Sequence, residues 1–155
     1  MSNDRYIWQE QRQPGGMFTY EGRINRKRYI IYSVVLYFVG YLAGKAYLVD
    51  LTGAMSLVMM VFKVVVFALL ALNIIKRLHD LLLPGWLGVV MVLTTFVVDV
   101  FAADILAFTK SAGTSRYLSD VIVLLSFFTI CMQVYLALKK GVAGPNKYGA
   151  DPLKK

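Results

Sequence analysis

Four apolar stretches of about twenty residues each dominate the sequence and constrain its fold more than any other feature. They are 29–49, 54–75, 86–108 and 118–138. A helix of about 20 predominantly apolar residues is long enough to cross the hydrocarbon core of a bilayer. Backbone groups in that core must be satisfied within a helix or a closed barrel, and these stretches lack the alternation of barrel strands. The sequence therefore predicts four transmembrane helices.

Basic residues are distributed unevenly among the segments that flank these stretches. The chain has a net charge of +8 and seventeen Lys and Arg side chains, of which thirteen fall in 1–28, 76–85 and 139–155. These three segments share one side of the membrane if the four helices alternate in direction. Cytoplasmic segments carry an excess of Lys and Arg. We therefore expect an all-α polytopic membrane protein, a compact antiparallel bundle of four transmembrane helices with both termini in the cytoplasm.

This topology divides the chain into a basic cytoplasmic segment 1–28, a transmembrane domain 29–138 and a basic cytoplasmic tail 139–155. The hydrophobic fraction is 58%, which is too large to be buried inside 155 residues, so lipid must cover the remainder. The first 28 residues include nine charged side chains and no apolar core, so we expect no cleavable signal peptide. A nucleic-acid-binding protein would carry its basic residues on a soluble surface, and no such domain is left over.

Three short motifs occupy the segments predicted to be cytoplasmic. They are YEGRINRKRY at 20–29, KRLHDLLLPGW at 76–86 and GPNKYGADP at 144–152. In this order and spacing they resemble domain-of-unknown-function family 805, a family of small bacterial inner-membrane proteins. The resemblance covers residues 20–152 and implies a four-helix fold in the bacterial inner membrane. It implies no activity, because the family has none assigned.

Because the three motifs are expected on one side of the membrane, we expect them to form one cluster. The third motif is rich in turn-forming residues, which predicts an ordered cap that folds back onto the cytoplasmic face. We interpret this cluster as a structural hub in which His79 makes hydrogen bonds among Arg23, Arg77, Asp80 and the cap. The residues assigned to the cluster are Gly22, Arg23, Arg26, Arg77, His79, Asp80, Gly85, Trp86, Asn146, Tyr148, Gly149 and Asp151.

The sequence offers little for catalysis. A nucleophile needs a base in reach, yet the single cysteine, Cys131, lies inside the fourth apolar stretch and no serine has a recognisable motif around it. One histidine and scattered acids do not provide the ligand spacing of a metal site. We therefore expect no catalytic residue, no metal and no cofactor. The expected role is non-enzymatic: structural, adaptor or regulatory.

Two charged residues lie deep within the predicted spans. Lys63 is nine residues from the outer end of the second stretch and Asp99 nine residues from the outer end of the third, which is roughly 14 Å in a helix. A charge at such depth is costly and pairs with another. We predict an intramembrane Lys63–Asp99 ion pair. It is either a structural pair that fixes helix register or the centre of a small oligomeric transporter or lipid-handling protein.

Two further features concern binding partners. Gly40 and Gly44 form a GxxxG pattern, which permits close helix approach within the chain or in a homo-oligomer. Basic residues beside a membrane attract anionic lipid headgroups, at about 1 kcal/mol each. The residues placed to do so are Arg26, Lys27, Arg28, Lys139 and Lys140. We expect membrane lipids with anionic headgroups as partners. A second copy of the chain or another membrane protein is a further candidate partner, and we expect no binding of nucleic acid.

Overall fold

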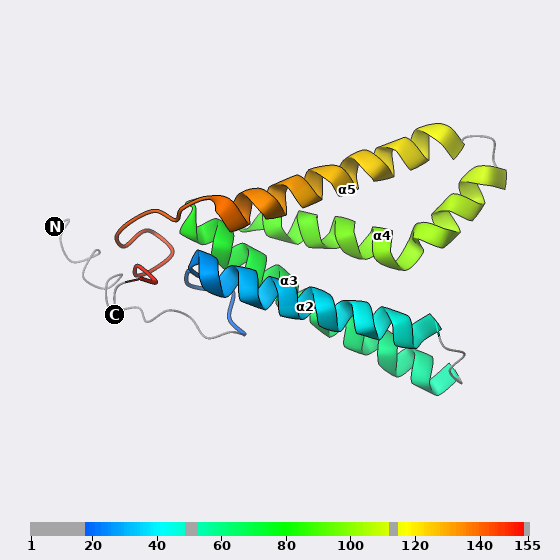
Figure 1. Cartoon of the computed structure of the whole chain (residues 1–155), viewed down its shortest axis with the longest axis horizontal. Helices are drawn as coiled ribbons and strands as arrows, with labels where there is room; N and C mark the ends of the chain where they lie inside the picture. The colour runs from blue at the N-terminus through cyan, green and yellow to red at the C-terminus, as the bar shows by residue number, and fades with distance from the viewer. Residues whose placement is uncertain (1–17, 49–52, 112–114, 154–155) are drawn as a thin grey trace.

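The computed structural model describes residues 18–48, 53–111 and 115–153. Within these residues the chain is all-α, with the four helices α2 (Arg26–Leu48), α3 (Gly53–Asp80), α4 (Trp86–Ser111) and α5 (Ser115–Leu138). Figure 1 shows that they form two hairpins, α2 with α3 and α4 with α5. Each helix overlaps one of the four apolar stretches, so the expected helices and their order are confirmed.

The helix α3 is longer than its apolar stretch and includes residues that we expected in a loop. It continues to Asp80, so only 81–85 connect it to α4. It ends in a Schellman motif, in which the Leu83 amide donates to the Leu78 carbonyl at 2.9 Å and the Leu82 amide to the His79 carbonyl at 3.2 Å. Leu82 holds the left-handed position at φ 61°, where glycine is usual. The added helical turn puts Arg77 and Asp80 three residues apart, on one face of the helix.

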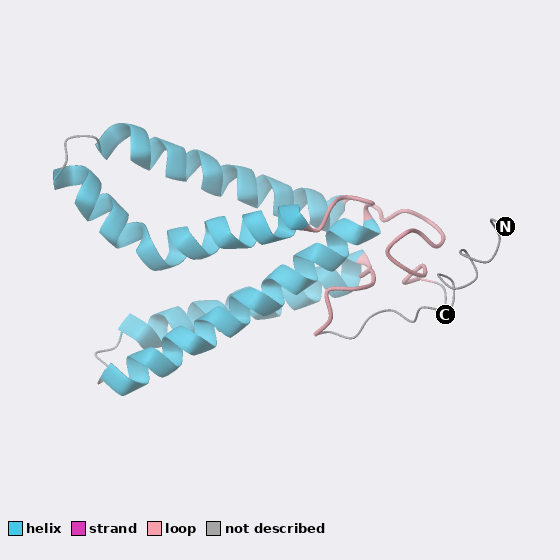
Figure 2. Cartoon of the chain, turned by 180° about the vertical axis from the view of Figure 1, so that it is seen from behind, coloured by secondary structure: helices cyan, strands magenta, loops and turns pink. Residues whose placement is uncertain are grey.

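The best-packed part of the core lies at the end of the molecule that holds the α3–α4 connection. Its most buried apolar side chains are Ile74, Leu78 and Leu136. Gly88 lets α4 approach α3 closely there, because a Cβ on Gly88 would lie 3.1–3.2 Å from side chains of α3. The two hairpins separate toward the opposite end, as Figure 1 shows from one side and Figure 2 from behind. The bundle is therefore less uniformly compact than we expected.

Two features accompany this separation. The helix α4 bends partway along its length (Figure 1). The hydroxyls of Thr94 and Thr95 on α4 each donate to the carbonyl four residues back, an arrangement that often bends helices. A cavity between α2, α4 and α5 also lies in this region.

The outer faces of the helices are apolar. Large side chains that are more than half exposed include Phe38, Leu57, Val61, Leu93 and Phe127. Among the described residues, two helical segments are long and apolar enough to cross a membrane: α3, and α5 from Asp120 to Leu138. The apolar part of α4, Trp86–Asp99, is shorter.

Candidate functional site

Two arginines and one aspartate form a buried ionic triad, Arg23–Asp80–Arg77, at the well-packed end of the molecule. Arg23 donates to Asp80 Oδ1 from Nε at 3.0 Å and from Nη2 at 2.9 Å. Arg77 donates from Nη1 to the other carboxylate oxygen. Arg23 is 4% exposed, Asp80 is 2% exposed and Arg77 is 0% exposed. Charges buried so completely are retained only where every polar atom has a partner.

The remaining arginine donors of the triad satisfy backbone carbonyls around it. Arg77 Nε donates to the Leu136 carbonyl at 2.8 Å and its Nη2 donates to the Lys139 carbonyl. These carbonyls lie at the C-terminal end of α5, where the last turn of a helix lacks internal donors. Arg23 reaches beyond α5, to the carbonyls of Val142 and Gly144, both at 2.5 Å. The triad thus joins the segment before α2, the end of α3 and the end of α5.

Residues 141–153, which come shortly after α5, fold onto the triad and are called the cap. The Val142 amide donates to the Asp80 carbonyl at 3.0 Å. Asn146 and Gly149 exchange two backbone hydrogen bonds at 3.0 Å, and Asn146 Nδ2 donates to the His79 carbonyl at 3.1 Å. Asp151 accepts the Gly144 amide at 2.9 Å. The cap is therefore an ordered segment held by both side chains and backbone.

His79 packs against the cap in a different way from the one we expected. Its ring stacks on the ring of Tyr148, with centroids 3.9 Å apart and an angle of 6° between the planes. Its Nδ1 is buried and has no hydrogen-bond partner in the described part of the chain. Gly85 lies on another edge of the ring, since a Cβ there would be 2.8 Å from His79 Nε2. The His79 ring thus contacts the cap by stacking on Tyr148, and its hydrogen bond is with the backbone of Gly22.

The structure brings together most of the predicted cluster. Arg26 lies at its margin, where Nη1 donates to the Leu138 carbonyl at 3.2 Å. Gly22 and Gly149 approach each other, with 3.8 Å between the Gly22 Cα and a Cβ built on Gly149. Trp86 is the exception, because its side chain is exposed at the start of α4. Among the described residues, no three His, Cys, Asp or Glu side chains gather as a metal site requires.

The five basic residues expected to meet lipid headgroups lie around the same end of the molecule. They are exposed, and they sit at the start of α2 and just after α5. Figure 1 shows these two helix ends close to the cap. The residues are Arg26, Lys27, Arg28, Lys139 and Lys140. They form a basic surface around the cap.

Lys63 and Asp99 are in direct contact between the two hairpins. Lys63 Nζ on α3 lies 2.5 Å from Asp99 Oδ2 on α4. Gly40 and Gly44 both face α3: a Cβ on Gly40 would lie 3.5 Å from Val66, and one on Gly44 would lie 4.0 Å from Lys63 Nζ. The GxxxG pattern is thus used within the chain, and it leaves room for the lysine beside α2.

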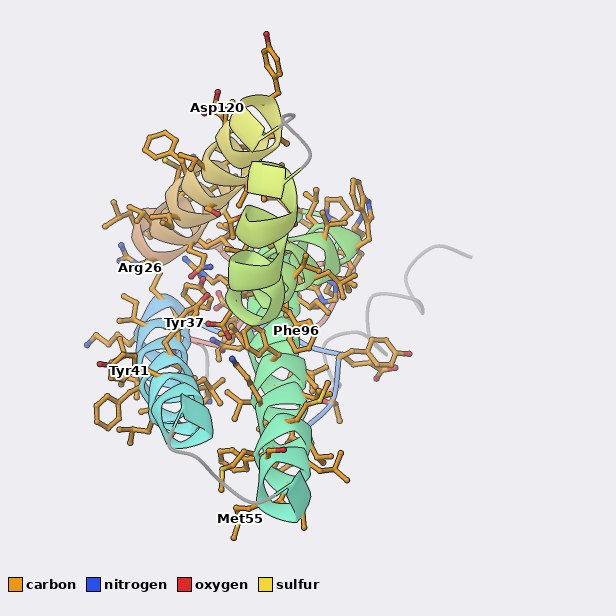
Figure 3. All side chains as sticks on the ribbon, turned by 90° about the vertical axis from the view of Figure 1, so that its right-hand side faces the viewer. Arg26, Tyr37, Tyr41, Met55, Phe96 and Asp120 are labelled. Carbon is orange, nitrogen blue, oxygen red and sulfur yellow. The ribbon has the colours of Figure 1, made fainter. Side chains whose placement is uncertain are left out.

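A cavity of about 310 Å³ lies next to this ion pair, between α2, α4 and α5. Seven of its nine lining residues carry polar groups. The polar lining residues are Tyr37, Thr94, Thr95, Asp99, Ser126, Thr129 and Gln133. In Figure 3, Tyr37 lies on the inner side of α2, toward α4, whereas Tyr41 lies on the outer side. Apart from Asp99, none of these residues was predicted from the sequence to belong to a site.

Three other important positions were also missed. Gly88 allows the close approach of α3 and α4, and Gly141 lies against the Asp80 carboxylate. Asn73 is buried in α3 and donates to Ser33 Oγ at 2.9 Å and to the Tyr29 carbonyl at 3.3 Å. An asparagine within an apolar stretch was a signal that could have been used, because a buried amide needs partners. The two glycines have no such signal.

Comparison with known proteins assigns a family to this arrangement. No curated protein and no solved structure matches the chain. One family model, described as "Protein of unknown function (DUF805)", matches residues 17–150 and so includes the triad, the ion pair and nearly all of the cap. The chain therefore belongs to the DUF805 family of proteins of unknown function.

Proposed function

We propose that this protein is a non-enzymatic integral protein of the bacterial inner membrane that presents a rigid basic platform to the cytoplasm. All four helices α2–α5 span the bilayer in this proposal, with both chain termini on the cytoplasmic side. The platform consists of the cap and the basic surface around it. Its role is that of a structural or adaptor protein that engages anionic lipid headgroups and presents the cap to a partner membrane protein.

The Arg23–Asp80–Arg77 triad is the observation that carries this proposal. Its charged groups are directed at one another and at backbone carbonyls, which rigidifies the cap instead of displaying charge for chemistry. Removing one partner of such a buried pair costs about 3–5 kcal/mol because it leaves an uncompensated buried charge, so we expect the triad to stay intact in the folded protein. The basic residues that remain exposed surround this rigid centre.

The expected topology can be tested by cysteine labelling. In a Cys131→Ser background we place a cysteine at Lys147, exposed in the cap, or at Tyr117, exposed near the start of α5. A membrane-impermeant maleimide added to spheroplasts should label Tyr117→Cys and leave Lys147→Cys unlabelled, and inverted vesicles should give the reverse. Labelling of Lys147→Cys in intact spheroplasts would refute the cytoplasmic cap.

Lipid retention tests the function of the basic surface. We expect the triple variant Lys27→Gln, Arg28→Gln, Lys140→Gln to retain at least fivefold less phosphatidylglycerol after purification in mild detergent, measured by mass spectrometry of the bound lipid. The reason is that each basic residue beside the membrane contributes about 1 kcal/mol to anionic lipid binding. The matched control is Lys147→Gln, an exposed lysine of the cap. Equal retention by the triple variant and the control contradicts the proposal.

A second candidate function is favoured by the cavity beside Lys63–Asp99, whose mostly apolar lining includes a carboxylate, hydroxyls and an amide. Charged and polar groups within a membrane domain mark pathways for polar solutes. The proposal here is a small transporter or lipid-handling protein. Four helices rarely enclose a complete pathway, so this function includes a homo-oligomer.

A further inference from the structure

The cavity between α2, α4 and α5 has walls that accept hydrogen bonds. Five of its lining residues carry hydroxyl groups. The four that are threonine or serine each donate the hydroxyl proton to the carbonyl four residues back in their own helix. The distances are 2.9 Å for Thr94, Thr95 and Thr129 and 2.8 Å for Ser126. A hydroxyl has one proton and two acceptor lone pairs. With the proton used inside the helix, the oxygen can only accept a hydrogen bond from the cavity.

The ion pair is oriented so that its negative partner lines this cavity. Asp99 is a lining residue and Lys63 is not. The Asp99 side chain is 46% exposed, compared with 17% for Lys63. A ligand in the cavity therefore meets the Asp99 carboxylate and several hydroxyl acceptors. The other two polar lining groups, the Tyr37 hydroxyl and the Gln133 amide, hydrogen-bond to each other. The carboxylate and the hydroxyl acceptors select a ligand that is positively charged and donates hydrogen bonds.

The size and the remaining lining residues define that ligand further. A volume of about 310 Å³ equals that of about ten water molecules in the liquid, which is far larger than a bare metal ion. Most of the lining surface is apolar, and Val98 and Ile130 contribute to it. The cavity therefore has room and contacts for a short hydrocarbon group beside the charged one. Among the described lining residues Asp99 is the single carboxylate, so it can pair with one ammonium group at a time, which in this structure is that of Lys63.

Lys63 itself shows which chemical group Asp99 accepts. The end of a lysine side chain is a primary alkylammonium, and here its Nζ lies 2.5 Å from Asp99 Oδ2. We propose that the cavity binds a small primary amine in its ammonium form, which takes the place of Lys63 Nζ at Asp99 while its N–H groups donate to the hydroxyls of α4 and α5. This deepens the second candidate function, which needs a ligand site, but binding can be measured in the absence of transport.

The test measures the binding of n-butylammonium to the full-length protein in detergent by isothermal titration calorimetry, at constant ionic strength. Tetramethylammonium, which has the same charge and no N–H donor, and sodium serve as comparison cations. Butylammonium should bind at least tenfold more tightly than either. Asp99→Asn should lose this binding, while the control Asp120→Asn, an exposed acid of α5 outside the lining, should keep it. Lys63→Met should bind butylammonium at least tenfold more tightly than the native protein, because the internal competitor is gone.

Three results would overturn the inference: equal binding of the three cations, unchanged binding in Asp99→Asn, or loss of binding in a folded Lys63→Met protein. If Lys63→Met does not fold, the double variant Thr94→Val, Ser126→Ala tests the same site. It removes two hydroxyl acceptors and leaves the ion pair intact, and it should weaken binding at least threefold; unchanged affinity refutes the site. Failure of amine binding together with flux of another solute in proteoliposomes would reject the amine and leave the second candidate function standing.

Discussion

Replacement of Arg77 by methionine should lower the thermal unfolding midpoint of the detergent-purified protein by about 10 °C. The substitution leaves the Asp80 carboxylate with one arginine fewer and leaves the carbonyls of Leu136 and Lys139 without this donor, all at a fully buried position. Removing one partner of a buried ion pair costs about 3–5 kcal/mol. For a chain of this size, 1 kcal/mol corresponds to about 2–4 °C in the midpoint. Differential scanning fluorimetry provides the measurement.

Two matched variants make this result specific to the triad. Arg28→Met removes an exposed arginine near the start of α2 and should shift the midpoint by less than about 2 °C, as is usual for surface substitutions. Arg77→Lys keeps the charge but lacks the planar fork of donors, so its midpoint should lie between those of the native protein and Arg77→Met. If Arg77→Met unfolds within 2 °C of the native protein, the triad does not hold the cap.

The features that depend on long segments of sequence could be predicted. The four apolar stretches each became a helix because the backbone groups between the two ends of a helix are satisfied within it, whatever lies around it. The contact of Lys63 with Asp99 was also predictable, since both charges were placed at the same depth in neighbouring helices. The grouping of the motifs was predictable as well. Successive motifs are separated by two helices that run in opposite directions, so 76–86 and 144–152 lie at the same end of the molecule.

The detailed geometry of the cluster was less predictable, and Asp80 shows why. Its neighbours Lys76, Arg77 and His79 are polar, which suggested a loop, whereas the structure continues α3 through all of them. The helix persists because the arginines and the cap bury and satisfy these polar groups. That stabilisation comes from residues 57 to 62 positions away in the sequence. Local sequence patterns do not record such contacts.

The cavity escaped prediction for a related reason. Thr94 and Ser126 each occur within an apolar stretch, where a hydroxyl commonly bonds to its own helix. They form one surface only because the α4–α5 hairpin aligns them, with Tyr37 of α2 completing the lining. Helical periodicity predicts which face of a helix a residue lies on, but it does not predict which other helix packs against that face.

The second large effect is expected from adding one methyl group, in Gly141→Ala. Gly141 is not among the glycines with positive φ, so its backbone accepts alanine. A Cβ at this position would lie 2.0 Å from Asp80 Oδ2 and 2.7 Å from Asp80 Cγ. The carboxylate must move, and both arginines of the triad then lose their bonds to it. We expect a loss of about 3 kcal/mol in stability, measured as a lower thermal unfolding midpoint.

A double-mutant cycle with Asp80→Ala identifies the cause of this loss. With the carboxylate removed, the three atoms nearest to the new methyl group are gone, so Gly141→Ala should cost less than about 1 kcal/mol in that background. Gly53→Ala is the matched control, because a Cβ there has no atom within 4 Å, and its midpoint should equal or exceed that of the native protein. An equal cost of Gly141→Ala with and without the Asp80 carboxylate would show that the cap depends on Gly141 for a reason other than its contact with the triad.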